Sequence, residues 1–507
     1  MSSNLEYIQI ENLRSLQMNA SVEMLPITIL VGKNSAGKST FARSFPLLRQ
    51  STEAKKRGPI LWFGDRVDFG SFEEAVSRSE KEPKEITISL GLTIHEDNQI
   101  GVNRGRKRLR RLIKTHTEIT IQKQGTSSHS STVKINAFGY NISLEINANN
   151  VMSRFNVDDV SWHADPKKLA IAQYGAILPN FRFFKYIAEH EFSIYTPFIA
   201  EIEKLLVGKR IEPIRVMLEN IIKSSPLLPI GTLSDYVLKD HGFIFKEMNP
   251  GVIKFIKNRL IKIEPFLFAS KINSLIDFLN SGIKDYYSGV KYIEPLRATA
   301  LRYYRKQELA IDEIDSKGEN LAMFIDNLSP SLLRNFNNWT KERFGFVAKT
   351  KNDGGHVAIV INENNSKAQS NLADIGFGVS QILPVITQIW YSTVKETQTD
   401  KKTTNCIVIE QPELHLHPSF QAKLADVFAT AIIDTKTNPP KFIIETHSNH
   451  IINRLGQLIS KGELKSSSVQ ILIFDKNEDS VTEISQANFD EEGYLTNWPI
   501  GFFEPEA

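Results

Sequence analysis

The sequence has 507 residues, 41% of them hydrophobic, and a formal net charge of +3. A chain of this length exceeds one hydrophobic core, so it predicts a globular protein of at least two lobes, and its charge alone indicates no partner. One cysteine, Cys406, excludes a disulfide framework, and the lack of any apolar stretch of about 18 residues excludes a membrane span. We therefore expect a cytoplasmic protein with no membrane partner.

The stretch Ile27–Thr40, ITILVGKNSAGKST, predicts a buried parallel strand followed by a phosphate-binding loop, since Gly32–Ser39 fits G-x-x-x-x-G-K-[ST]. In such a loop the backbone amides surround the phosphates of a nucleoside triphosphate, the lysine reaches the β- and γ-phosphates, and the hydroxyl binds Mg²⁺. The preceding strand and the following helical start argue against an ordinary Gly/Ser turn. The candidate nucleotide-binding residues are Asn34, Ser35, Ala36, Gly37, Lys38, Ser39 and Thr40, with Ser39 also a candidate ligand of Mg²⁺.

Residues 85–147 contain the short alternating runs ITISLGL, TEITIQK, TVKINA and NISLEI, which predict an antiparallel β-subdomain in an N-terminal lobe of residues 1–149. Between the first two runs lies the densest cluster of positive charge. As a hairpin it would bind nucleic-acid phosphates without sequence preference; it is equally consistent with a solvated loop or a surface for an acidic protein. Its residues are Arg104, Arg106, Lys107, Arg108, Arg110, Arg111 and Lys114.

Residues 150–289 carry aromatic and aliphatic residues at spacings of three and four, interrupted by prolines, and predict a helical insertion. No heptad pattern continues over three or four repeats, which excludes a long coiled coil. Strand character returns at Val290, and residues 290–507 predict a second α/β lobe.

Two strands in this second lobe end in residues suited to nucleotide chemistry. The run NCIVIE ends in Glu410, and a strand-end carboxylate in a P-loop protein holds Mg²⁺ through water. The strand in KFIIETHS places His447 to sense a γ-phosphate or to orient the attacking water. His415 and His417 beside Glu413 have the residue types of a metal site, but this spacing alone is a weak signal.

The segment Leu372–Ile386, LADIGFGVSQILPVI, predicts an anion site at a helix N-terminus, because glycines precede Ser380, Gln381 and an apolar helical run. The segment has no lysine of its own. One explanation is that it contacts the γ-phosphate of a nucleotide held by another subunit.

Together these segments resemble an α/β ABC-type ATPase head of the group that contains RecF, SMC and OLD proteins. GKNSAGKST resembles the Walker A motif, IVIEQPELHLHP the Walker B motif and D-loop, GFGVSQ the signature motif, and IIETHS the switch histidine. The resemblance implies ATP and Mg²⁺ as cofactors and a head-to-head dimer, or a higher oligomer, in which Gly378, Ser380 and Gln381 act in trans.

The sequence departs from this group at Gln411, which stands where a glutamate usually activates water. Glutamine cannot accept that proton. Either Glu413 substitutes, or Glu410 acts alone, or hydrolysis is slow; we expect slow turnover.

The C-terminal NFDEEGYLTNWPIGFFEPEA, with EQPELHLHP and IEPLRATALRYYR, is similar to the ATPase subunit of Septu anti-phage defence systems, including those joined to retrons. Only residues 448–507 follow His447, fewer than the roughly 100 of a typical domain, so we expect no nuclease domain of the Toprim type. The resemblance implies a scaffold that regulates a separate nuclease, such as an HNH protein, with a retron reverse transcriptase and its RNA and DNA as further partners. The alternative is a RecF-like DNA-binding ATPase in DNA repair.

Overall fold

In the computed structural model the chain forms two compact units, which are described separately. The P-loop unit comprises Leu13–Gln50, Trp62–Ala75 and Asp285–Ala507. The β-rich unit comprises Met1–Asn12, Ser51–Leu61 and Val76–Lys284. The structure describes residues 2–18, 20–78, 84–100, 107–124, 128–163, 170–183, 225–240, 249–307, 311, 313–363, 368–398, 405–435, 439–477 and 481–499.

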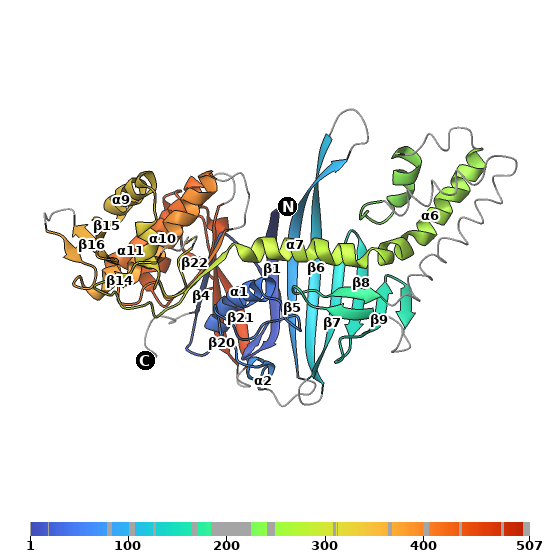
Figure 1. Cartoon of the computed structure of the whole chain (residues 1–507), viewed down its shortest axis with the longest axis horizontal. Helices are drawn as coiled ribbons and strands as arrows, with labels where there is room; N and C mark the ends of the chain where they lie inside the picture. The colour runs from blue at the N-terminus through green and yellow to red at the C-terminus, as the bar shows by residue number, and fades with distance from the viewer. Residues whose placement is uncertain are drawn as a thin grey trace. The chain divides into compact units, whose positions relative to one another are not determined.

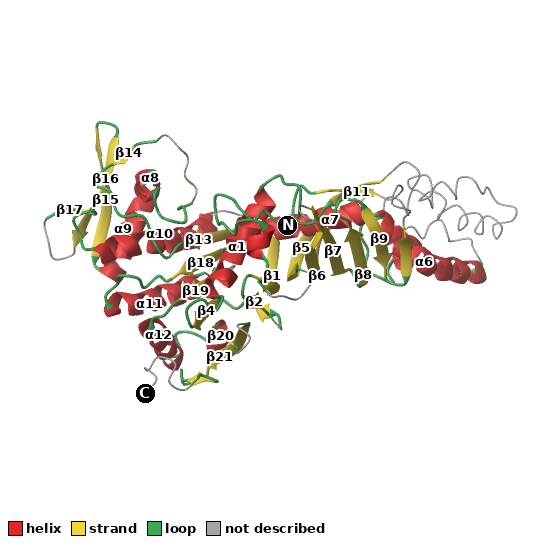
Figure 2. Ribbon diagram, turned by 90° about the horizontal axis from the view of Figure 1, so that it is seen from below, coloured by secondary structure: helices red, strands yellow, loops and turns green. Residues whose placement is uncertain are grey.

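The P-loop unit is built on a mainly parallel sheet in the order β21-β20-β4-β19-β18-β13 (Figure 2). Strand β4 is parallel to both β19 and β20, and β18 is parallel to both β19 and β13. All residues of β4 and β18 are buried, as expected for strands covered on both faces. The strands are β4 (Ile27–Gly32), β13 (Val290–Ile293), β18 (Cys406–Glu410), β19 (Lys441–Glu445), β20 (Val469–Lys476) and β21 (Thr482–Phe489).

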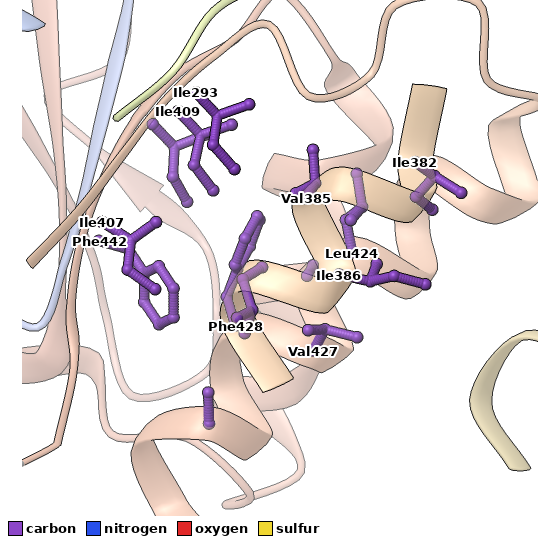
Figure 3. Close-up of a cluster of buried hydrophobic side chains, with 14 of the residues drawn as sticks. Ile293, Ile382, Val385, Ile386, Ile407, Ile409, Leu424, Val427, Phe428 and Phe442 are labelled. Atoms are coloured by element: carbon purple, nitrogen blue, oxygen red, sulfur yellow. The ribbon is translucent and has the colours of Figure 1, made fainter. Parts of the chain in front are cut away.

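The core of this unit lies between the sheet and two helices, α10 (Phe377–Gln398) and α11 (Pro418–Asp434). Figure 3 shows apolar side chains of both helices facing those of β13, β18 and β19. This packing fixes the strands whose carboxyl ends carry the candidate site. The residues labelled there, each at most 1% exposed, are Ile293, Ile382, Val385, Ile386, Ile407, Ile409, Leu424, Val427, Phe428 and Phe442.

The other elements of the P-loop unit are shorter or lie beside this sheet. A separate small sheet has the order β14-β16-β15, with β17 paired to β16. The bounds are β2 (Leu16–Gln17), β3 (Val22–Glu23), α1 (Lys38–Glu53), α2 (Phe72–Ala75), β14 (Tyr304–Arg305), α8 (Leu321–Asp326), α9 (Pro330–Phe344), β15 (Phe346–Asp353), β16 (His356–Glu363), β17 (Ser370–Asn371), α12 (Asn449–Ser460), η3 (Ser466–Ser468) and β22 (Leu495–Thr496).

The β-rich unit is an antiparallel sheet in the order β10-β9-β8-β7-β6-β5-β1. Figure 1 shows helix α7 lying across its strands. The approach is close, because a Cβ atom at Gly282 of α7 would lie 2.5 Å from Ile94 Cδ1 of β5. The elements are β1 (Ser2–Leu13), β5 (Glu85–Ile100), β6 (Lys107–Gln124), β7 (Ser128–Ala137), β8 (Tyr140–Ile146), β9 (Met152–Val157), β10 (Val160–His163), β11 (Ala170–Gln173), β12 (Asn180–Phe183), α5 (Leu233–Asp235), η1 (Tyr236–Asp240), α6 (Pro250–Ser270) and α7 (Ile272–Ser288).

The predicted α/β fold class with an antiparallel β-subdomain is confirmed. The longest described helix, α10, has 22 residues, in agreement with the predicted lack of a long coiled coil. The helical insertion is wrong for Met152–Val157, Val160–His163, Ala170–Gln173 and Asn180–Phe183, which form strands β9 to β12. Here Asp158, at φ +47°, lies in the tight turn between β9 and β10, and Trp162 of β10 is in register with Phe155 of β9. Residues 184–224 and 241–248 lie outside the described residues.

The two units also divide the chain differently from the predicted boundaries at 149 and 289. The division follows the pairing of β4. This strand lies between β19 and β20, and both of these strands come from the C-terminal part of the sequence. The N-terminal phosphate-loop segment therefore belongs to the same unit as the C-terminal lobe. In the part of the chain that the structure describes, no helix combines the length and the apolar character that a membrane crossing requires.

Candidate nucleotide site

The phosphate-binding loop, Gly32–Ser39, joins β4 to α1 and requires glycine at its first position. Gly32 has φ +142°, and a Cβ atom there would lie 2.0 Å from the Phe474 carbonyl oxygen of β20. Thr482 Oγ1 donates to the Ala36 carbonyl at 2.9 Å and holds the middle of the loop. The loop is thus shaped by its own backbone and by strands from the C-terminal end of the chain.

Lys38 lies across this loop and is 3% exposed. Its ammonium donates to the carbonyl oxygens of Gly32 and Lys33, both at 2.8 Å. Burial lowers the pKa of Lys38, and the nearby Glu445 carboxylate partly offsets this effect. The loop's positive charge is therefore held inside it, where an incoming phosphate can exchange with the two carbonyl contacts.

The remaining predicted loop residues divide into an exposed and a buried group. Asn34 and Ser35 are exposed, and Ser35 adopts a left-handed φ of +61°. Ala36, Gly37 and Thr40 are buried. Because α1 begins at Lys38, its free N-terminal amides lie at the end of the loop and favour an anion there.

Glu445 meets the Ser39 hydroxyl, although its role was not predicted from the sequence. Ser39 Oγ donates to Glu445 Oε2 at 2.7 Å, and Glu445 is 3% exposed. It is the last residue of β19, in register with Glu410 on β18 and Leu30 on β4. Burial and then the charge of Glu410 raise the pKa of Glu445 to about 7. A carboxylate that ends an apolar strand directly before Thr446 and His447 was the available signal.

Glu410, the predicted metal-binding carboxylate, has hydrogen-bond donors on both oxygens. Arg43 Nε and Nη2 donate to Oε1 and Oε2 at 2.7 and 2.8 Å, and the Tyr292 hydroxyl donates to Oε1 at 2.7 Å. The hydrogen bond with Glu410 raises the pKa of Arg43, and burial raises that of Tyr292. Arg43 was missed, although it follows Ser39 by four residues and so shares its face of α1.

Glu413 and Gln411 lie just beyond the end of β18. Glu413 is buried, which raises its pKa, and its Oε1 accepts from the His447 backbone amide at 2.7 Å. Gln411 adopts a left-handed φ of +44°, and its amide donates to the Glu445 carbonyl at 2.7 Å. The turn after β18 is thus tied to the end of β19.

A buried arginine, Arg297, also supports this turn. Its Nη2 donates to the carbonyl oxygens of Glu410 and Gln411, both at 3.3 Å, and burial lowers its pKa to about 10. Within the described residues, Arg297 Nε and Nη1 and Glu413 Oε2 are buried without a hydrogen-bond partner. Arg297 thus supports the turn through its contacts with the two backbone carbonyl groups.

The His447 side chain is exposed at the same edge of the sheet. Although the residue as a whole is exposed, partial desolvation of its ring and then the charge of Lys38 lower the pKa of His447. The imidazole is therefore neutral at neutral pH and can accept or donate a hydrogen bond to a phosphate or a water molecule.

The oxygen atoms of Ser39, Glu410 and Glu445 suit Mg²⁺, which prefers hydroxyl, carboxylate and phosphate ligands. Among the residues that the structure describes, no group of three or more His, Cys, Asp or Glu side chains could hold a metal ion. His417 instead caps α11, its Nδ1 accepting from the Ser419 amide at 3.3 Å, and the His415 ring packs against Phe377 at 4.9 Å. These two histidines have structural contacts.

The glycine-rich segment precedes and opens α10. Ser380 Oγ donates to the Phe377 carbonyl at 2.8 Å, and a Cβ atom at Gly378 would lie 3.3 Å from the His415 carbonyl oxygen. Gln381 is buried, and its Nε2 has no partner among the described residues. Within that same part of the chain, no hydrogen bond joins these residues to Gly32–Thr40.

The residues of the basic cluster that the structure describes lie on a strand. Lys107, Arg108, Arg110, Arg111 and Lys114 belong to β6, whose pairing with β5 sets Asp97 opposite Arg110 and Glu96 opposite Arg111. The predicted strands were too short, since β5 continues to Ile100 and β6 begins at Lys107. Arg104 and Arg106 lie outside the described residues. A role in nucleic-acid binding stays a prediction.

Gln50, near the end of α1, contacts a neighbouring loop. Its Oε1 accepts from the Val67 amide and its Nε2 donates to the Val67 carbonyl, both at 3.2 Å. The side chain is buried in this pair of contacts.

The profile of the AAA ATPase domain family matches residues 4–452. The chain belongs to this family. Among proteins of curated function, none matches it in sequence. The chain is similar in structure to the SMC head domain from Thermotoga maritima, at 8% identity and a TM-score of 0.35, over 96% of this chain and 98% of that one.

Two structures of the recombination mediator protein RecF of the RecFOR pathway are also similar. The RecF-ATP structure has 12% identity and a TM-score of 0.30, with 96% of this chain and 99% of that one covered. The RecF-ATPrS structure has 10% identity and a TM-score of 0.28, with 95% and 98% covered.

In this AAA ATPase domain, the ends of the three parallel strands carry different chemical groups. The loop after β4 offers amides and an ammonium to phosphates. The ends of β18 and β19 offer carboxylates to a cation, and the neutral His447 can orient water.

Proposed function

We propose that this AAA ATPase domain binds Mg²⁺·ATP at Gly32–Thr40, hydrolyses it slowly, and uses the bound state to regulate a partner nuclease. The observation that carries the proposal is the convergence of Lys38, Ser39, Glu410 and Glu445 at the carboxyl ends of three neighbouring parallel strands. Ligands of open α/β sheets bind at this edge.

Slow turnover is supported by how the carboxylates are engaged. Gln411 is neutral, Glu413 accepts from His447, and Glu410 is held by Arg43 and Tyr292. A positioned general base contributes about 10²–10⁴-fold to rate, so its lack slows hydrolysis by a comparable factor. Binding itself does not depend on this base.

The test is steady-state ATP hydrolysis by the full chain and by Gln411→Glu. We expect slow turnover by the wild type and at least a tenfold increase in Gln411→Glu, with Gln411→Asn as the matched control that adds no carboxylate. A wild-type rate typical of ABC enzymes, abolished in Glu410→Ala and unchanged in Glu413→Ala, contradicts slow turnover.

The partner proposed for the ATP-bound state is a separate nuclease of an anti-phage defence complex in the cytoplasm, such as an HNH protein. This proposal rests on the resemblance of EQPELHLHP, IEPLRATALRYYR and the C-terminal segment to Septu ATPase subunits. A head-to-head dimer would place Gly378, Ser380 and Gln381 on the partner's nucleotide.

Affinity purification of the full chain expressed from its own operon, followed by mass spectrometry and nuclease digestion, tests this partner. A stoichiometric nuclease, or a reverse transcriptase with its RNA, supports the defence complex. A homodimer that retains only DNA contradicts it and favours the RecF-like alternative.

The RecF-like alternative rests on the basic residues of β6. Under it, Lys114→Gln and Arg111→Gln weaken duplex DNA binding and reduce the slope of log affinity against log salt by about 0.9 for each phosphate that is no longer neutralised. Under the scaffold proposal, the same substitutions leave the nuclease complex intact.

A further inference from the structure

The position of Glu445 bears on which carboxylate binds the metal. Mg²⁺ holds its oxygen ligands at about 2.0–2.1 Å in octahedral geometry, so adjacent ligand atoms lie about 2.9 Å apart. Ser39 Oγ and Glu445 Oε2 are 2.7 Å apart. The hydrogen bond between these two oxygens therefore already holds them at a separation that is compatible with neighbouring ligands of one ion.

Glu410 is engaged differently. Its carboxylate forms a bidentate pair with Arg43 and accepts a third hydrogen bond from Tyr292. Only 1% of Glu410 is exposed, whereas the Arg43 side chain is 35% exposed. A metal that replaced Arg43 would therefore break the ion pair that neutralises a buried carboxylate and would leave the partly buried guanidinium without its partner. Arg43 thus already supplies the positive charge that Glu410 requires.

The order of the strands explains this difference. Strand β19 lies between β4 and β18, so the end of β19 is nearer to the phosphate-binding loop than the end of β18. Glu445 reaches Ser39 at the start of α1, whereas Glu410 reaches Arg43 one turn further along.

We propose that Glu445, and not Glu410, is the protein carboxylate that binds Mg²⁺ together with Ser39 and the nucleotide phosphates. This inference rests on the proposed function, because it assigns the metal ligand of that same site. Glu410 and Arg43 then form a positioning pair that orients α1 behind the metal.

The proposal predicts that Mg²⁺ strengthens nucleotide binding through Glu445. Without the metal, the Glu445 carboxylate lies close to the site of the phosphates and repels them. With the metal, the same carboxylate becomes a ligand. Removal of its charge therefore weakens Mg²⁺·ATP binding and does not weaken metal-free ATP binding.

The test is equilibrium titration of a fluorescent non-hydrolysable ATP analogue into the full chain, with Mg²⁺ and with EDTA. The ratio of the two dissociation constants measures the Mg²⁺ enhancement. In Glu445→Gln we expect this ratio to fall at least tenfold, since loss of even an outer-shell partner costs about 10–100-fold in metal affinity. Metal-free binding at least as strong as that of the wild type shows that the variant is folded.

The matched control removes the other carboxylate together with its partner, as Arg43→Gln/Glu410→Gln, so that no buried charge is left unpaired. We expect its Mg²⁺ enhancement to stay within threefold of the wild type, whatever its absolute affinity. Loss of the enhancement in this control, with its retention in Glu445→Gln, overturns the inference while the proposed function stands. Failure of the wild type to bind the analogue under both conditions overturns both.

Discussion

The two units differ in the edges of the sheet at which their strands end. In the P-loop unit β4, β19 and β18 are parallel, so their carboxyl ends reach one edge of the sheet and Lys38, Glu445 and Glu410 gather there. In the β-rich unit neighbouring strands are antiparallel, so successive strand ends emerge at opposite edges. Parallel pairing therefore concentrates chemical groups that lie far apart in the sequence.

The polar side chains of the β-rich unit instead form local pairs across strands. Tyr7 on β1 is hydrogen-bonded to His116 on β6 at 2.8 Å, and Thr87 on β5 to Thr120 on β6 at 2.9 Å. Such pairs stabilise a sheet without forming a site. The difference predicts that substitutions in the P-loop unit change nucleotide binding and that those in the β-rich unit change stability alone.

The largest effect is expected from Gly32→Ala. A Cβ atom 2.0 Å from the Phe474 carbonyl oxygen would force β4 and β20 apart, and φ +142° is unfavourable for alanine. We expect a loss of about 3 kcal/mol or more in the stability of the P-loop unit, seen as a lower urea midpoint, together with loss of nucleotide binding. Gly376→Ala, with open space around its Cβ, should change little; equal midpoints in the two variants would contradict the close approach.

Lys38→Ala should come next and act on binding. Two charge-assisted hydrogen bonds to phosphate contribute about 3 kcal/mol, which corresponds to a roughly hundredfold weaker affinity for the ATP analogue. Lys33→Ala is the control, because Lys33 is exposed and its ion pair with Asp475 spans 3.6 Å. Wild-type affinity for the analogue in both variants would exclude Lys38 as a phosphate ligand.

Glu313→Gln should reduce stability in a pH-dependent way. Burial would raise the pKa of Glu313, but Lys291 and Arg49 outweigh it and hold the pKa at about 2. The folded carboxyl pKa is depressed, so its stabilisation of about 2–3 kcal/mol is present above about pH 4.5 and lost as the pH falls toward 2. Thermal denaturation of both proteins between pH 7 and pH 3 should show converging midpoints; a constant difference would argue against the ion pairs as the cause.

The smallest effect is expected from Tyr7→Phe in the β-rich unit. It removes the hydrogen bond to His116 and should cost about 1 kcal/mol by urea denaturation. Affinity for the ATP analogue should be unchanged. A change in nucleotide affinity would contradict the prediction that substitutions in the β-rich unit change stability alone.

The sequence predicted the residues whose roles are set by local spacing. Lys38 and Ser39 follow from the loop motif, and Glu410 and His447 follow from apolar strands that end in polar residues. Glu445 was missed because its contact with Ser39 depends on β19 lying between β4 and β18, a pairing that no local pattern specifies.

The same limit explains the errors in the fold. The β-subdomain was predicted from alternation, but its extension through β9 to β12 was not, because short runs of apolar residues fit a helix and a strand equally well. The partnership of Arg43 with Glu410 joins residues 367 positions apart. Arg43 follows Ser39 by four residues on α1, but only the folded sheet shows which carboxylate it meets.

The most direct test is a crystal structure of the full chain with Mg²⁺ and a non-hydrolysable ATP analogue. We expect phosphates in the loop Gly32–Ser39 and a metal ion bound by Ser39 and Glu445, with Arg43 still paired to Glu410. A nucleotide bound elsewhere, or a metal ion held by Glu410 after displacement of Arg43, would contradict the proposed site.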